Sequence, residues 1–264
     1  MRNVITIARK ELSIYFTTVI GYACFGSFAF IMGLLFVTTV NKYQQYTQYY
    51  LSQSQPQLLE QLNFNEGIIS PMLSTGLWMF LFYVPFLTMR LFAEEKSSRT
   101  FELLLSAPIT SFEMVLGKFF GVGFVVLVLS LIPLAFPLIL HLYGTTSGGG
   151  SPVEWLPVVS GTLTMLAVGL CFSSFGLFIS SLTESQIVAA LLTFAVLLLA
   201  FLLPLIAGRV EGDWQTVVEY LTPMSHITRG LQGRVFLSDL VYFFSTTLTA
   251  LFFTLRVVES HRWR

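Results

Sequence analysis

Six long apolar runs constrain the fold of this chain more than any other feature of its sequence. A helix needs roughly 20 apolar residues to cross the hydrocarbon core of a bilayer. Apart from Arg256 near the end of the sixth run, no Asp, Glu, Lys or Arg interrupts them. The sequence therefore predicts an all-α integral membrane protein with six transmembrane helices, organised as one domain over residues 1–264. The runs are Thr18–Val40, Met72–Met89, Phe119–Leu142, Val158–Leu182, Ile187–Ala207 and Leu240–Val258.

Composition supports this class and excludes others. Charged residues make up 11% of the chain and hydrophobic residues 55%, whereas soluble domains average about 25% charged residues. The formal net charge of zero argues against a nucleic-acid-binding surface. Cys24 and Cys171 both lie inside apolar runs, so we expect free thiols and not a disulfide framework.

The placement of Lys and Arg predicts the orientation, because these residues are enriched on the cytoplasmic side. If both termini are cytoplasmic, four of the 14 basic residues face outward, namely Lys42, Arg209, Arg229 and Arg234. The other ten face the cytoplasm: Arg2, Arg9, Lys10, Arg90, Lys96, Arg99, Lys118, Arg256, Arg262 and Arg264.

The first 17 residues have the pattern of an amphipathic helix. Apolar side chains recur at helical spacing through Val4, Ala8, Leu12 and Tyr15. Arg9, Lys10 and Glu11 interrupt this pattern, and we place them off the apolar stripe. We expect a helix that lies in the membrane interface; the alternative is a simple extension of the first span.

Two longer segments, 41–71 and 208–239, are expected on the outer side. In the first, Tyr43, Tyr46 and Tyr50 share a helical face, which predicts a surface helix anchored by tyrosines at the interface. In the second, Trp214, Val217, Val218 and Leu221 have helical spacing and Pro223 breaks the run. This pattern fits a pair of short helices packed on the spans as well as it fits a surface loop.

The charged stretch between the second and third runs, RLFAEEKSSRTFELLLSAP over Arg90–Pro108, is the strongest candidate for a functional site. Topology alone explains its Lys and Arg residues. It does not explain Glu94, Glu95 and Glu102, because acidic residues contribute little to orientation. We therefore predict that the 90–118 loop carries a binding surface and does more than connect the second and third spans.

Small residues and prolines inside the runs indicate how the helices pack. Pairs four residues apart allow close helix approach, and they include Gly117 with Gly121, Gly169 with Ser173, and Gly176 with Ser180. Pro85, Pro133 and Pro137 are expected to kink their spans.

Other kinds of site are not supported by the sequence. The glycine-rich stretch Thr145–Pro152 lacks the lysine and the Ser or Thr at the spacing that a phosphate-binding loop requires. His141, His226 and His261 are scattered, so neither a metal site nor a catalytic triad is expected, and we expect no cofactor. The spans lack the midplane ionisable groups of ion-coupled carriers, so energy for transport would come from elsewhere. The alternative hypothesis is that the chain is a self-sufficient channel or membrane enzyme.

A family resemblance appears at the charged loop. Phe92–Lys96 (FAEEK), Thr100–Leu105 (TFELLL), Pro108 and Leu116–Lys118 (LGK) resemble the signature of the ABC-2 transporter permease superfamily, the type V ABC exporters. The terminal stretches Ala8–Leu12 (ARKEL) and Glu259–Arg264 (ESHRWR) resemble the same family. Within it, the chain looks most like the gliding-motility permease (GldF-like) branch.

The resemblance implies a membrane subunit of an ATP-driven exporter in the bacterial inner membrane. It implies a cytoplasmic coupling helix between spans 2 and 3 that inserts into a separate ABC ATPase subunit, present in two copies, and a second permease chain, identical or different. It assigns the short outer helices to Trp214–Val235 and the anchoring of the coupling helix to Leu103, Leu104 and Leu105. An alternative within the family is mechanotransmission, in which ATP hydrolysis moves a separate outer partner and nothing crosses. The coupling residues that it implies are Glu94, Glu95, Lys96, Arg99, Thr100 and Glu102.

Overall fold

The computed structural model describes residues 2–52, 64–144, 153–207, 220–234 and 236–262, and the described residues form helices and no strands. Six helices are long and apolar enough to cross a membrane, and each contains one of the predicted apolar runs or most of it. The all-α prediction is confirmed. The helices are α1 (Arg2–Thr17), α2 (Val19–Ser52), η1 (Asn65–Ile69), α4 (Ser70–Thr88), α5 (Arg90–Ser97), α6 (Thr100–Ser106), α7 (Ser111–Leu131), η2 (Ile132–Leu134), α8 (Ala135–Tyr143), α9 (Trp155–Leu182), α10 (Gln186–Ala207), α12 (Pro223–Leu231) and α13 (Leu237–Arg262).

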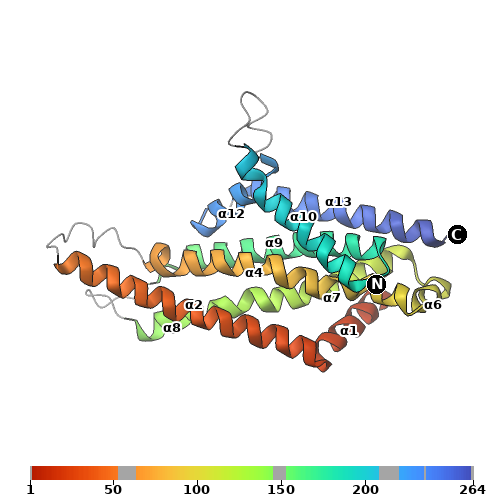
Figure 1. The fold of residues 1–264 in the computed structure, drawn as a ribbon, viewed down its shortest axis with the longest axis horizontal. Helices are drawn as coiled ribbons and strands as arrows, with labels where there is room; N and C mark the ends of the chain where they lie inside the picture. Colours follow the sequence, from red (N-terminus) through yellow and green to blue (C-terminus); the bar gives the residue numbers. More distant parts are fainter. Residues whose placement is uncertain (1, 53–63, 145–152, 208–219, 235, 263–264) are drawn as a thin grey trace.

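The long helices form a bundle with α9 at its centre (Figure 1). Helix α9 is the most buried of the six spans, and α4, α7, α10, α12 and α13 all pack against it. Both chain termini, α1 and α6 lie at one end of the bundle, which we call the terminal end, and α8 lies toward the opposite, far end.

Glycines on α9 let neighbouring helices approach its backbone closely. A Cβ atom on Gly169 would lie 2.4 Å from Cγ1 of Val126 on α7 and 2.7 Å from the Phe80 ring on α4. A Cβ on Gly176 would lie 2.1 Å from Oγ1 of Thr88. The predicted close packing at these two small residues is confirmed, and it explains why α9 can be surrounded on several sides.

Helix α1 packs directly on the first half of α7. A Cβ atom on Gly117 would lie 2.7 Å from Cβ of Ile7, and one on Gly121 would lie 2.7 Å from Cβ of Glu11. These two glycines, which are one helical turn apart, form the contact surface for α1. The chain then turns sharply between Thr17 and Val19, where α2 begins.

The outer segments differ from the predictions in part. Residues 41–52 are helical as expected, but the prediction of a separate helix lying on the surface is wrong, because α2 continues without a break through Ser52. No Pro or Gly interrupts Asn41–Ser52, so nothing ends the helix. At 1.5 Å per residue its 34 residues measure about 51 Å, so it extends beyond a hydrocarbon core of about 30 Å.

The short helix expected between the fifth and sixth spans is confirmed at α12, which packs on α9 through buried side chains including Ile227 and Leu231. Trp214, Val217, Val218 and Val235 lie outside the described residues, and so does the glycine-rich stretch at 145–152.

The prolines expected to kink their spans have different effects on their helices. Helix α4 continues past Pro85 to Thr88. At Pro133 the α-helix gives way to a 3₁₀ turn that separates α7 from α8, as expected where a backbone N–H is missing. Pro137 lies in the first turn of α8 and does not end it.

Candidate functional site

The charged loop forms a helix–turn–helix at the terminal end of the bundle. Helix α5 ends at Ser97, and Arg99 adopts a left-handed conformation with φ of 58° before α6 starts at Thr100. Among the non-glycine residues described, Arg99 alone has a positive φ, and such residues mark turns or functional strain. The Oγ atoms of Ser98 and Thr100 are 2.9 Å apart, and Thr100 Oγ1 also donates to the Glu95 carbonyl at 3.3 Å.

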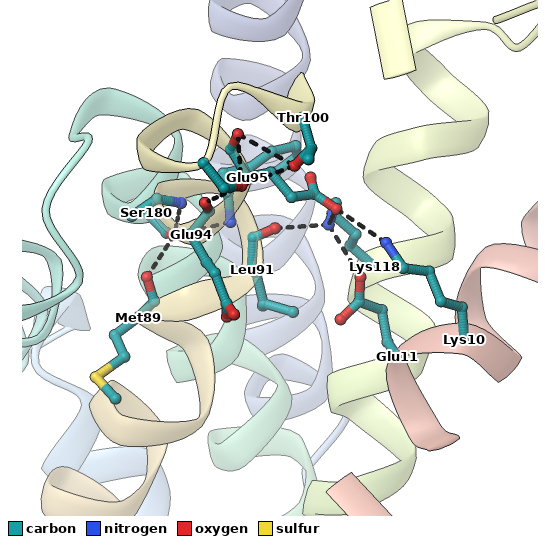
Figure 2. Close-up of polar contacts among 12 residues, drawn as sticks. Lys10, Glu11, Met89, Leu91, Glu94, Glu95, Thr100, Lys118 and Ser180 are labelled. Atoms are coloured by element: carbon teal, nitrogen blue, oxygen red, sulfur yellow. Dashed lines mark hydrogen bonds and ion pairs between the residues drawn. The ribbon is translucent and has the colours of Figure 1, made fainter. Parts of the chain in front are cut away.

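Helix α5 is fixed to the central helix α9 by one buried serine. The Ser180 hydroxyl oxygen accepts hydrogen bonds from the backbone N–H groups of Phe92 (3.1 Å) and Ala93 (3.2 Å). The same hydroxyl donates to the Met89 carbonyl at 3.0 Å (Figure 2). Ser180 therefore satisfies backbone groups at the junction of α4 and α5.

A buried ion network joins α5 to α1 and α7. The Lys118 ammonium group on α7 lies 2.8 Å from Oε1 of Glu95 on α5 and 3.0 Å from Oε1 of Glu11 on α1 (Figure 2). It also donates to the Leu91 carbonyl at 2.6 Å. Lys118 is only 1% exposed, so its charge is stable there because three oxygen atoms surround it. Lys10 adds a more exposed contact to Glu95 at 3.3 Å.

The network corrects the expectation that Glu11 lies off the apolar stripe. Glu11 is buried against Gly121 and paired with Lys118. The spacing itself contains the signal, because Ala8, Glu11 and Tyr15 are three and four residues apart and share one helical face. Arg9 and Lys10 are exposed, as expected.

The predicted coupling residues separate into an exposed and an internal group. Glu95 is buried in the network, and Lys96 is half-buried, with its ammonium group donating to the Ser181 carbonyl at 2.5 Å. Four residues are exposed, and we call them the loop surface: Glu94, Arg99, Thr100 and Glu102.

Helix α6 is anchored by an aromatic residue and not by Leu103. Leu103 is 70% exposed, Leu104 is partly buried against the core, and the side chain of Leu105 lies outside the described set. Phe101 is buried and packs edge-on against Phe92, with ring centroids 6.1 Å apart. The expectation of an anchor at Leu103 is therefore wrong, because that side chain faces away from the bundle.

The end of α13 contacts the same loop. His261 lies edge-on to Phe101, and its Nε2 atom is 3.3 Å from the Lys96 ammonium group. Arg262 donates to the Ile109 carbonyl at 3.2 Å. The C-terminal residues that resembled the family thus lie beside the loop, although Trp263 and Arg264 lie outside the described residues.

Tyr15, near the end of α1, contacts residues on both sides of the junction between α4 and α5. Its hydroxyl donates to the Leu87 carbonyl at 2.5 Å, and the Arg90 guanidinium lies 4.3 Å from the centre of its ring. Burial raises the pKa of the Tyr15 phenol well above its usual value, and the nearby Arg90 charge opposes that rise. Tyr15 therefore remains a neutral hydrogen-bond donor that joins α1 to the end of α4.

A second buried polar cluster lies where α12 meets α13. Asp239 Oδ1 lies 2.6 Å from both His226 Nδ1 and Arg229 Nη2, and His226 Nε2 lies 3.0 Å from the Tyr220 carbonyl. The His226 ring stacks on Tyr242 with centroids 4.2 Å apart. Sequence analysis missed this cluster; the available signal was His226 and Arg229 three residues apart on one helical face. In the part of the chain that the structure describes, no three His, Cys, Asp or Glu side chains could hold a metal ion.

The comparisons with known proteins agree with this architecture. Residues 37–257 match the family model described as ABC-2 family transporter protein, and the matched region includes the loop surface, Ser180 and Lys118. A comparison with curated proteins found no significant match. The family match does not resolve branches, so assignment to the gliding-motility group stays a prediction. Since the matched region covers far more than half of the 264 residues, this chain belongs to the ABC-2 family of transporter proteins and is a multi-pass membrane component of a transporter.

Proposed function

We propose that this chain is the permease subunit of an ATP-driven exporter and that a separate ABC ATPase docks on the loop surface. The observation that carries the proposal is the pairing of an exposed, charged helix–turn–helix with a buried network behind it. By the distribution of Lys and Arg, the terminal end faces the cytoplasm of a bacterial inner membrane. The ATPase is therefore expected to approach α5 and α6 from that side.

The exposed residues would make the contacts with the ATPase. Glu94 and Glu102 offer carboxylates for basic groups, and Arg99 offers a guanidinium for a carboxylate. Arg99 is exposed and lies in the turn between α5 and α6, where it adopts a left-handed conformation. Glu95 and Lys96 face inward, so we assign them the role of positioning α5.

Movement of the loop would be transmitted along two routes. Ser180 joins the start of α5 to the central helix α9, and Lys118 joins α5 to α7 and α1. Because these groups are buried and packed, a push on α5 is expected to shift whole helices as rigid bodies. Two such permease chains, identical or different, and two ATPase copies would frame one pathway.

Co-purification with the ATPase tests this assignment. The full chain carrying Glu94→Lys and Glu102→Lys is expected to lose ATPase affinity by roughly tenfold or more, because like charges facing each other in an interface cost several kcal/mol. Glu66→Lys provides a matched control, since Glu66 is an exposed carboxylate in η1, away from the loop. Unchanged affinity and stimulation with the double reversal would overturn the docking assignment.

A further inference from the structure

An apolar groove runs along one side of α7. One hollow of about 640 Å³ lies between α1 and α7 and is lined by Val4, Ala8 and Leu12 together with Leu116 and Phe120. A second hollow of about 560 Å³ lies between α7, α9 and α13. Leu116 and Phe120 line both hollows, so the two hollows adjoin along α7, and we call them together the α7 groove.

The groove is suited to a hydrocarbon chain. Its second part is lined by side chains such as Ala167, Leu170 and Leu248, and almost all of its surface is apolar. Phe120, Phe244 and Leu248 are about half exposed or more, so the groove opens outward where the bilayer surrounds the spans. Each hollow falls within the roughly 300–1,000 Å³ typical of small-molecule sites. An empty groove would forfeit the dispersion contacts that close packing supplies.

A single unpartnered cation stands at the α1 end of the groove. Arg9 and Glu113 are its two charged lining residues. The Glu113 carboxylate already accepts hydrogen bonds from Asn3 at 3.2 Å and from the Thr110 backbone at 3.1 Å. Arg9 has no hydrogen bond or ion pair with any residue that the structure describes. A guanidinium is well suited to bind phosphate oxygens in a bidentate manner.

We propose that the α7 groove binds an anionic phospholipid from the membrane, with the phosphate on Arg9 and an acyl chain along α7 toward α13. Arg9 lies on α1 between Ile7 and Glu11, which pack against Gly117 and Gly121 at the start of the third apolar run; the ends of apolar runs are expected at the depth of lipid headgroups. Such a lipid would contact α1 and α7 beside the Glu11–Lys118 pair, so it would stabilise the packing of these two helices. This binding does not depend on the ATPase partner.

Photolabelling tests the proposal. The full chain is reconstituted in phosphatidylcholine vesicles that contain a minor fraction of phosphatidylglycerol with a diazirine in one acyl chain. After illumination, labelled residues are mapped by peptide mass spectrometry. We expect labels concentrated on α7 near Phe120 and on α13 near Leu248, in excess of those on the exposed face of α2.

Three variants separate specific binding from bulk contact. Arg9→Gln is expected to lower groove labelling roughly tenfold, because charge-assisted hydrogen bonds are lost. Arg2→Gln, which removes an exposed charge that does not line the groove, should leave labelling unchanged. Ala167→Phe should remove labelling from the α13 part while Arg9 is intact.

Three outcomes would overturn the proposal. Equal labelling of the exposed faces of all spans, or labelling that Arg9→Gln does not reduce, would mean bulk lipid contact only. Cross-links from groove residues to a second copy of the chain would mean that the groove is a subunit interface.

Discussion

The Lys118 ammonium group of α7 lies 2.8 Å from the Glu95 carboxylate of α5, in an interior where Lys118 is almost fully shielded from solvent. Glu11 of α1 completes the arrangement at 3.0 Å. The Lys118 charge therefore joins α1, at the start of the chain, to α5 and α7.

Lys118→Met should be strongly destabilising. It leaves Glu11 buried without its cation and Glu95 with only the exposed Lys10, and breaking a buried ion network in this way costs about 3–5 kcal/mol. Neutralising the carboxylates as well, in Glu11→Gln/Glu95→Gln/Lys118→Met, should recover most of that loss, because no uncompensated charge remains. Thermal unfolding in one detergent at a fixed scan rate checks both variants. If Lys118→Met alone is as stable as the wild type, the network is not buried as described.

Glycine substitutions should separate the α1–α7 contact from open positions. Gly121→Ala places a Cβ 2.7 Å from Cβ of Glu11, so α1 must shift and stability should fall. A Cβ on Gly26 of α2 meets no atom of the described residues within 4 Å beyond its own stretch of helix backbone. Gly26→Ala should therefore be neutral or stabilising by up to about 1 kcal/mol, because alanine favours the helix. Thermal unfolding of the pair measures the difference. Equal effects at the two positions would contradict the close packing of α1 on α7.

Ser180→Ala should loosen α5 without unfolding the bundle. It removes the hydroxyl that accepts from the Phe92 and Ala93 amides, at a cost of about 1 kcal/mol per hydrogen bond. Hydrogen exchange at these two amides should accelerate. Ser173→Ala is the matched control, because among the described residues buried Ser173 bonds only to the Gly169 carbonyl of its own helix. If exchange at α5 is unchanged in Ser180→Ala, Ser180 does not hold the helix.

Asp239→Asn should release α12 from α13. The change removes the negative charge that His226 and Arg229 share, and a buried charged hydrogen bond contributes about 1.5–3 kcal/mol. Faster hydrogen exchange over 223–231 would report the release. Arg256→Gln breaks an exposed ion pair with Glu259 and should have little effect, since such pairs contribute about 0–1 kcal/mol. Equal exchange in the two variants would argue against the cluster as a clamp.

The sequence was sufficient to predict the spans, because each apolar run has the length that a bilayer requires. It was also sufficient to locate the charged loop. It could not show that Glu11 and Lys118 are buried, since charged side chains are normally exposed and their pairing joins residues 107 positions apart. The same limit applies to Asp239 and His226. The polar composition of residues 41–52 predicts exposure, but it does not show whether the helix of the first span continues through them.

The distinction between the loop surface and the buried network gives the most direct test of the proposed coupling. The measurement is the stimulation of ATP turnover by the permease at a saturating concentration of the Glu11→Gln/Glu95→Gln/Lys118→Met variant. This variant keeps Glu94, Arg99 and Glu102 exposed, so the ATPase should bind it with near wild-type affinity. Because α5 is no longer joined to α1 and α7 by charge, while Ser180 still joins it to α9, stimulation of ATP turnover should fall well below the wild-type level. Full stimulation by a variant that binds normally would contradict the proposal that the Lys118 network couples the loop to the membrane helices.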